Sequence, residues 1–384
     1  MSERLSAAGW GVWERAGLGL LAAAVCSASA ISACSGDGHS ANANGAGSES
    51  NNGVTAPGVS EPPSEGPAAA VDSEESADGT ARVAAADIPT DPNFKVAFIG
   101  DTASGDDFHS VLQLVKREGA QLALVQGDLT YDGEAPPEWF SAIDAEINTA
   151  QTQIPYFISK GNHDSGWSQI GSGLKSRMST WGIPPENNDP TTKNYSVVYK
   201  GLKVVMVSDS ETSPTRASYV KDRLADDAHI WKICSWHKNQ RATNVGPKSD
   251  EMGWTIYENC RAQGAIVAQG HSHTYSRSKT VTNDQSQTID STCSSPFDLC
   301  LAPGKHFFFD SSRGGHDIRP LDTTVASKPY WGSTYGGSFG ALFITFYVDG
   351  DPRKARGYFK TVDDVIVDPP ASSGKTSFTI TRAP

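Results

Sequence analysis

Basic residues are scarce in this 384-residue sequence, in which 32 lysines and arginines face 44 aspartates and glutamates for a formal net charge of −12. The deficit is concentrated in residues 35–92, where ten acidic residues accompany a single arginine. Because residues 1–34 are balanced, residues 93–384 keep a net charge of only −3. A nucleic-acid-binding face needs concentrated positive charge. Neither part of the chain indicates one, so we expect no nucleic-acid partner.

The acidic segment also lacks large apolar residues. Residues 35–92 contain no aromatic residue and no leucine, and they consist largely of serine, glycine, alanine, proline and acidic residues. Such a composition buries too little apolar surface to offset the entropy lost on ordering. We therefore predict a disordered tether here. Residues 93–384 are then left to form one large globular domain.

The first 34 residues have the pattern of an export signal. Arg4 and Arg15 precede a run of small and apolar residues, "AGLGLLAAAVCSASAISA". The run ends in "ISAC", which resembles the bacterial lipoprotein box, in which the cysteine (here Cys34) is lipidated and becomes the mature N-terminus. We predict a membrane-anchored lipoprotein at the cell surface or in the periplasm. A plain signal peptide, which would give a secreted protein, and an uncleaved anchor are the alternatives.

No two cysteines have the C-x-x-C spacing, which argues against a zinc knot. Apart from Cys26 and the lipidation candidate, four cysteines remain in the globular part. Four cysteines in an exported protein suggest two disulfides. The stretch "CSSPFDLC" favours Cys293–Cys300 as a short closed loop, which leaves Cys234–Cys260 as the other pair. The spacing alone does not fix this connectivity.

Short apolar runs alternate with amphipathic stretches from residue 93 onward. The runs predict buried strands at 94–100, 121–127, 154–161, 202–209, 231–237 and 265–271. The stretches predict helices at 107–118, 137–148, 213–225 and 250–262. This alternation favours a layered α/β fold. Four later runs lack intervening helices and predict antiparallel strands that complete a second sheet, at 305–312, 339–348, 355–362 and 377–382.

Potential metal ligands follow five of the predicted strands. They are Asp101, Asp128, the group Asn162-His163-Asp164, His237, and the pair His271 and His273. Layered α/β folds place their sites at the carboxyl ends of strands, and a glycine before four of these groups permits a sharp turn. Two residues apart in an extended segment, His271 and His273 point to the same side. Each group alone has an ordinary interpretation as a turn, but their order indicates a shared site.

That order resembles the calcineurin-like metallophosphoesterase family, whose blocks run D…GD…GNH…H…GHxH. The matching residues are Asp101, "GDLTY" (127–131), "GNHD" (161–164), "SWH" (235–237) and "GHSH" (270–273), within a resemblance that spans about 94–347. The common first block, D-x-H, is broken because Ala103 stands in place of the histidine, and Tyr131 supplies a replacement ligand. This exchange resembles the purple acid phosphatase branch, in which the tyrosine is a phenolate on a metal that is usually ferric iron.

The resemblance implies a four-layer αββα sandwich with two mixed sheets, formed by residues 93–384. It also implies two metal ions, iron with a second iron, zinc or manganese, because one carboxylate can bridge a pair of such ions. Asp128 is the implied bridge. Asp101, Tyr131 and His273 are the other implied ligands of the first metal, and Asn162, His237 and His271 those of the second.

The implied activity is hydrolysis of small phosphate esters, phosphomonoesters first, by attack of a metal-bound hydroxide on phosphorus. His163 is then expected to stabilise the transition state or to protonate the leaving oxygen. Asp164 either orients the His163 imidazole or caps the following turn. The alternatives are a phosphodiesterase or nucleotide hydrolase of the same family, or a surface lipoprotein that binds a partner through an inactive shell. All seven ligand positions carry competent side chains, which favours an enzyme.

Several segments outside these blocks are candidates for contact with substrate. We expect 165–194 and 274–305 to be loops that decide specificity. The stretch "SSRGGHD" (311–317) could border the site through Arg313 or His316, although an ordinary exposed turn is the favoured interpretation. Three residues that follow a ligand are weaker candidates for phosphate contact, with surface solvation equally expected: Lys238, Asn239 and Arg241.

Overall fold

The computed structural model describes residues 91–384. The proposed signal segment with Cys34, and the proposed tether up to residue 90, lie outside the described residues. Within the described part of the chain, no helix combines the length and the apolar character that crossing a membrane requires.

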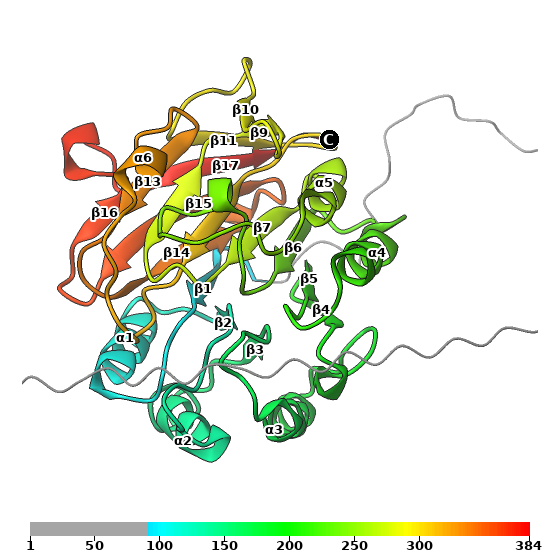
Figure 1. Ribbon diagram of the computed structural model, residues 1–384, viewed down its shortest axis with the longest axis vertical. Coiled ribbons are helices and arrows are strands. Elements are labelled where there is room, and N and C mark those ends of the chain that lie inside the picture. The colour runs from blue at the N-terminus through cyan, green and yellow to red at the C-terminus, as the bar shows by residue number, and fades with distance from the viewer. Residues whose placement is uncertain (1–90) are drawn as a thin grey trace, which may run out of the picture. The chain divides into compact units, whose positions relative to one another are not determined.

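Two large sheets carry most of the chain (Figure 1). The first has the order β11-β17-β15-β14-β1-β2-β3, with β16 paired to β15. Its strands are β1 (Phe94–Ile99), β2 (Leu122–Val125), β3 (Tyr156–Ile158), β11 (Asp298–Leu301), β14 (Gly340–Phe346), β15 (Lys354–Thr361), β16 (Ile366–Asp368) and β17 (Phe378–Arg382). Both sheets are mixed: β1 and β2 are parallel, whereas β1 and β14 are antiparallel.

The second sheet has the order β13-β8-β12-β7-β6-β5-β4. Its strands are β4 (Tyr195–Tyr199), β5 (Leu202–Met206), β6 (Trp231–Ser235), β7 (Ile266–Gln269), β8 (Tyr275–Ser278), β12 (Phe308–Ser311) and β13 (Trp331–Tyr335). A separate two-stranded ribbon pairs β9 (Val281–Asn283) with β10 (Thr288–Ile289).

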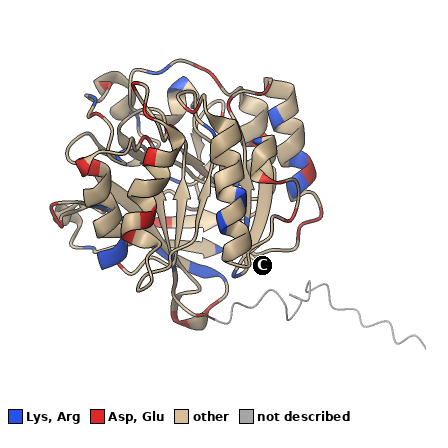
Figure 2. Cartoon of the chain, turned by 90° about the horizontal axis from the view of Figure 1, so that it is seen from below, with Lys and Arg blue, Asp and Glu red and all other residues tan. Residues whose placement is uncertain are grey.

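Helices form the outer layers (Figure 1). On the side of the first sheet lie α1 (Asp106–Arg117), α2 (Pro136–Ile147) and α3 (Trp167–Thr180), and on the side of the second sheet lie α4 (Ser213–Leu224) and α5 (Trp254–Ala262), with the short α6 (Thr323–Ala326) nearby. Acidic residues open α1 and basic residues close it, as the helix dipole favours. Acidic and basic residues are interspersed along the helices seen in Figure 2, which agrees with the nearly neutral charge of residues 93–384.

Adjacent residues of the second sheet belong to different hydrophobic cores. In β5, Val204 joins the core shared with the first sheet and α1 to α3, whereas Val205 joins the core beneath α4 and α5. In β6, Ile233 and Cys234 divide in the same way. Successive side chains of a strand point to opposite faces, so both faces of this sheet are covered. The predicted four-layer αββα sandwich is confirmed.

Aromatic residues join the two sheets. The rings of Phe98 and Phe309 meet edge to face with centroids 5.0 Å apart, and those of Trp231 and Phe346 do so at 5.2 Å. Edge-to-face pairs add specific geometry to the area that they bury. The sheets are thereby held in one relative position, on which any site built from both of them depends.

The expectation of a loop at 165–194 is wrong, because α3 occupies its first half. Trp167, Ile170, Leu174 and Met178 are buried, and their spacing of three to four residues forms one apolar stripe against the first sheet and α2. The serines and glycines between them obscured this stripe in the sequence.

The four C-terminal strands do not all complete the second sheet, as we expected them to do. Strand β12 lies between β7 and β8 in the second sheet, whereas β14, β15 and β17 extend the first sheet beyond β1. Every residue of β14 is buried, as expected for a strand that has neighbours on both edges and cover on both faces. Apolar runs predicted these strands, but a run does not specify the neighbour with which it pairs.

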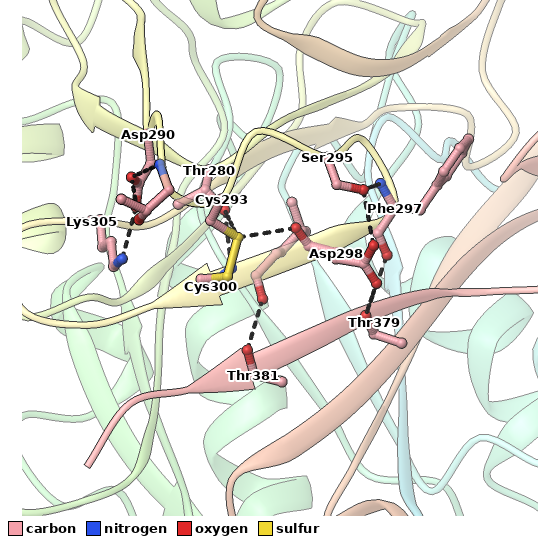
Figure 3. The surroundings of a disulfide bond; sticks show 12 residues. Thr280, Asp290, Cys293, Ser295, Phe297, Asp298, Cys300, Lys305, Thr379 and Thr381 are labelled. Atoms are coloured by element: carbon pink, nitrogen blue, oxygen red, sulfur yellow. Dashed lines mark hydrogen bonds and ion pairs between the residues drawn. A yellow bond between two sulfur atoms is a disulfide. The ribbon is translucent and has the colours of Figure 1, made fainter.

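The segment 274–305, which we expected to be a loop, contains β8 to β11 and a disulfide. The structure contains the disulfides Cys293–Cys300 and Cys234–Cys260, the pairing that the sequence favoured. Figure 3 shows the first of them, which joins the segment after β10 to β11, where the Cys300 amide donates to Thr280 Oγ1 at 3.0 Å. The second joins β6 to α5.

A buried ion pair also links the sheets. The Arg277 guanidinium on β8 donates from Nε and Nη2 to the two oxygens of Asp368 on β16, at 2.7 and 2.8 Å. The Tyr275 hydroxyl donates to the same carboxylate at 2.6 Å. Arg277 and Asp368 are both fully buried.

We expect Asp368→Asn to lower the free energy of unfolding by about 3–5 kcal/mol, because it leaves the Arg277 guanidinium buried without a counter-charge. Urea denaturation measures the change. The control is Lys175→Met, which breaks the exposed Lys175–Asp189 pair and should cost less than about 1 kcal/mol. Equal costs for the two variants would show that burial of the pair is unimportant.

Candidate metal centre

The loops after β1, β2, β3, β6 and β7 approach one another so closely that glycine is required. A Cβ on Gly127 would lie 2.9 Å from His237 Cβ, and Gly127 has a φ of +80° that favours glycine. A Cβ on Gly161 would lie 2.2 Å from Asp128 Oδ1. The glycines that precede the polar groups therefore allow loops from both sheets to meet at one point.

Four of the proposed ligands have a left-handed backbone. The φ angles are 58° at Asp101, 52° at Asp128, 79° at His271 and 55° at His273. Residues other than glycine adopt this conformation at a cost of order 1–3 kcal/mol, and they do so mainly where the surrounding structure enforces it. Their recurrence at the ends of β1, β2 and β7 marks this edge as a functional site.

The first group of side chains consists of Asp101, Asp128, Tyr131 and His273. The Tyr131 hydroxyl lies 3.1 Å from Asp101 Oδ1 and 3.3 Å from Asp128 Oδ2. His273 Nε2 lies 3.2 Å from Asp101 Oδ1 and 3.5 Å from the Tyr131 oxygen. All four side chains are buried. Two carboxylates, a phenol and an imidazole thus point at one volume.

The second group consists of Asp128, His237 and His271, whose potential ligand atoms all lie within 4.8 Å of one another. His237 Nε2 lies 2.9 Å from Asp128 Oδ2 and 3.0 Å from His271 Nδ1. Asp128 is common to both groups. Its position suits a carboxylate that bridges two ions.

Outer contacts fix the two imidazoles of the second group. His237 Nδ1 lies 2.7 Å from the Gln126 carbonyl, which leaves Nε2 to face Asp128. His271 Nε2 lies 3.0 Å from Glu251 Oε2, which leaves Nδ1 to face His237. Carboxylate or carbonyl contacts of this kind orient metal-binding histidines. Glu251 could not be recognised as part of the site from the sequence, because the residue precedes α5 and lies outside every motif.

Electrostatics favour the uptake of cations. Burial and the nearby carboxylates of Asp101 and Asp128 raise the pKa of the Tyr131 phenol far above its ordinary value. A phenolate at this position therefore needs a strongly charged cation beside it. Burial works against protonation of His237, yet Asp128 and Asp101 raise its pKa to about 10. Carboxylate, phenol and imidazole donors together suit iron, zinc or manganese. The residues thus fit a pair of metal ions.

Asn162 and His163 lie at the mouth of the site. The Asn162 side chain is exposed and forms no hydrogen bond within the described residues, so its place as a ligand stays a prediction. The His163 side chain is 47% exposed, its Nε2 lies 4.0 Å from Asp128 Oδ2, and its ring packs on Tyr131 with centroids 4.4 Å apart. The His163 amide also donates to Asp128 Oδ1 at 2.8 Å. The imidazole is therefore placed to meet an incoming ligand.

Asp164 does not orient the His163 imidazole, and this expectation is corrected. Its carboxylate is fully buried and accepts the amides of Asp128, Leu129 and Gly161 at 3.1, 2.8 and 2.8 Å. These bonds join the loop after β2 to the loop after β3. Asp164 thus positions the backbone that carries Asp128, and its oxygens are not directed to the reaction volume.

The stretch 311–317 borders the site, so the favoured interpretation of an exposed turn is also wrong. Arg313 is buried and donates from Nη1 to the His273 carbonyl at 2.9 Å. The His316 ring stacks on Tyr131 with centroids 3.5 Å apart, and its amide donates to the Asp101 carbonyl at 2.9 Å. The glycine pair before His316 repeats the signal of the other blocks, a strand end followed by glycine and a potential ligand.

The three weaker candidates for phosphate contact already form interactions within the protein. Lys238 pairs with Glu251 at 2.9 Å, and Asn239 Nδ2 donates to the buried Asp310 carboxylate at 3.1 Å. Arg241 pairs with Asp322. These contacts direct none of the three side chains toward the proposed metal ligands.

We expect Asp128→Asn to abolish metal retention, because the amide removes the negative charge common to both groups. Elemental analysis of the purified protein after dialysis measures the loss. His163→Ala is the control and should retain the metals, since its ring lies outside both groups. Loss of metal from His163→Ala would contradict the separation of His163 from the ligands.

Comparison with known proteins agrees with this geometry. Residues 94–275 match the calcineurin-like phosphoesterase family. Two Arabidopsis thaliana proteins are similar over about half of the chain: purple acid phosphatase 22 (23% identity over 204 residues, 49% of this chain and 46% of that protein) and purple acid phosphatase 21 (25% over 199 residues, 49% and 45%). The chain therefore spans about half the length of these curated relatives.

A solved structure shares the fold. It is the purple acid phosphatase PPD1 from yellow lupin (Lupinus luteus), with a TM-score of 0.55 at 17% identity, over 75% of this chain and 53% of that one. The matched region, 94–275, contains every residue of both groups described above. Residues 94–275 therefore form a calcineurin-like phosphoesterase domain, and the similar proteins support a metallophosphoesterase that resembles the purple acid phosphatase branch.

Proposed function

We propose that this protein is an exported phosphoesterase with two metal ions that hydrolyses phosphomonoesters. One observation carries the proposal: Asp128 is shared by two buried groups of metal-binding side chains, at an edge where His163 is exposed. Two adjacent cations attract the phosphoryl oxygens and lower the pKa of water for in-line attack on phosphorus. The residues of the chain then have to keep the site rigid and to donate a proton to the leaving oxygen.

The proposed ligands divide as the geometry groups them. Asp101, Tyr131 and His273 serve the first metal, and His237 and His271 serve the second, with Asp128 between the two. Asn162 completes the second set after its exposed side chain turns inward. A phenol among the donors favours a ferric ion in the first position. Iron, zinc or manganese suits the second.

His163 is the proposed catalytic histidine. Its exposed imidazole lies beside Asp128 and over Tyr131, so it can reach a phosphoryl group without being a ligand itself. From there the ring donates a hydrogen bond to the phosphoryl oxygens or a proton to the leaving oxygen. The hydrogen bond from the His163 amide to Asp128 keeps this ring next to the shared carboxylate.

Export is supported by the two disulfides of the described residues, since such bonds persist in oxidising compartments. We propose that residues 1–34 direct export, that Cys34 carries the lipid anchor, and that residues 35–92 tether the domain of residues 93–384 to the membrane. Mass spectrometry of the mature N-terminus distinguishes a lipidated Cys34 from a cleaved, soluble form.

The wild-type protein should hydrolyse p-nitrophenyl phosphate, and His163→Ala should lower kcat about 10²- to 10⁴-fold while the metals stay bound. His109→Ala is a matched control, because the His109 ring pairs with Glu146 away from the cluster. An inert wild-type protein with a full complement of metal would instead identify an inactive binding module.

Tyr131→Phe should remove the visible charge-transfer band of the iron-loaded protein, because the substitution deletes the phenol oxygen and keeps the ring. Absorption spectra of the two proteins, recorded after the same oxidative loading with iron, provide the measurement. A wild-type protein that stays colourless despite bound iron would refute a tyrosine–ferric contact.

A further inference from the structure

One loop, residues 244–251, approaches the His271 imidazole at both of its nitrogens. Glu251 Oε2 lies 3.0 Å from Nε2, on the outer side. Lys248 Nζ lies 3.5 Å from Nδ1, the nitrogen that also faces His237 Nε2 at 3.0 Å. The ammonium group of Lys248 therefore reaches the inner side of the ring, at the edge of the second group.

The 244–251 loop is held in place by close packing. A Cβ on Gly246 would lie 2.7 Å from the Ser272 carbonyl, so the loop touches the backbone between His271 and His273. The Val245 carbonyl accepts the Asp322 amide at 2.7 Å, and the Lys248 amide donates to the Gly246 carbonyl at 3.0 Å. These contacts bring Lys248 to a defined position beside the site.

Lys248 forms no close ion pair within the described residues, and the carboxylates of Asp101, Glu251 and Asp128 act on its charge only from farther away. The nearby Lys238 donates to Glu251 Oε1 at 2.9 Å, so the charge of Lys238 has a carboxylate partner. For Lys248, the described residues offer no carboxylate within ion-pair distance, and its one side-chain contact is with His271. A partly buried cation without a partner is costly to maintain. An anion that enters the site would supply the missing partner.

We propose that Lys248 binds the phosphoryl group of the substrate, with its ammonium donating to an oxygen that faces away from the metal ligands. Hydrogen bonds between ions are stronger than those between neutral groups, and lysine acts on phosphate as a point charge. Its added positive charge favours a dianionic monoester over a monoanionic diester. This inference rests on the proposed function and deepens it, since it assigns a residue of this chain to the recognition of phosphomonoesters.

Binding of inorganic phosphate tests the inference without catalysis. Isothermal titration calorimetry on the full-length, zinc-loaded protein should show about 10- to 100-fold weaker phosphate affinity for Lys248→Met than for wild type. Lys248→Arg should restore most of the affinity. The control is Lys175→Met, which removes the same charge at the exposed Lys175–Asp189 pair on α3 and should bind phosphate as wild type does.

Hydrolysis of two esters tests the substrate class. For Lys248→Met, KM for p-nitrophenyl phosphate should rise by about the same factor as the phosphate dissociation constant. KM for bis(p-nitrophenyl) phosphate, with one charge fewer, should rise several-fold less. Equal losses for the two esters would overturn the preference for monoesters.

Chemical acetylation gives a third measurement. Inorganic phosphate should protect Lys248 from an acetylating reagent, whereas the modification of Lys175, quantified by mass spectrometry in the same sample, should not change. Phosphate affinity that is equal in wild type and Lys248→Met, or absent in wild type, would overturn the inference. A protein that binds phosphate through Lys248 yet hydrolyses neither ester would refute the proposed function and leave this inference standing.

Discussion

The site depends on the carboxylate of Asp128, whose negative charge burial alone would disfavour. The Tyr131 hydroxyl lies between Asp128 and a second buried acid, Asp101, and these two carboxylates raise the pKa of the buried His237 to about 10. Buried charges persist in proteins when they are paired or when they coordinate metals. The arrangement is therefore most stable with cations between the side chains. The strained backbone at Asp101, Asp128, His271 and His273 is consistent with selection for that function over stability.

Rigidity around this carboxylate comes from a layer of hydrogen bonds beneath it. Asp164 joins the loops after β2 and β3, Gln126 and Glu251 hold two imidazoles, and Arg313 holds the backbone of His273. A site that is preorganised in this way spends less energy on ordering when it binds a ligand. The same layer explains why residues from five separate segments can act as one unit.

The sequence revealed those parts of the site that follow a local rule. A buried run, a glycine and a polar residue define the end of a strand, and this pattern predicted Asp101, Asp128 and His271 at one edge. His237 lacks the glycine and was predicted from the order of the motifs. Glu251 and Lys248 could not be found in this way, because the packing of Gly246 on Ser272 brings them to His271. His316 does follow the local rule, and it was undervalued because a glycine-rich stretch after a strand was interpreted as an ordinary exposed turn.

The position of β14 has a consequence for the order of assembly. Residues Phe94 to Phe98 of β1 pair with Phe346 to Leu342 of β14, from the far end of the chain. Contacts between residues so distant in sequence slow folding, because a very long loop must close before they can form. The strand that delivers Asp101 has no partner on one edge until almost the whole polypeptide has been synthesised. The loop that carries Asp101 therefore reaches its final support late in folding, once β14 has paired with β1.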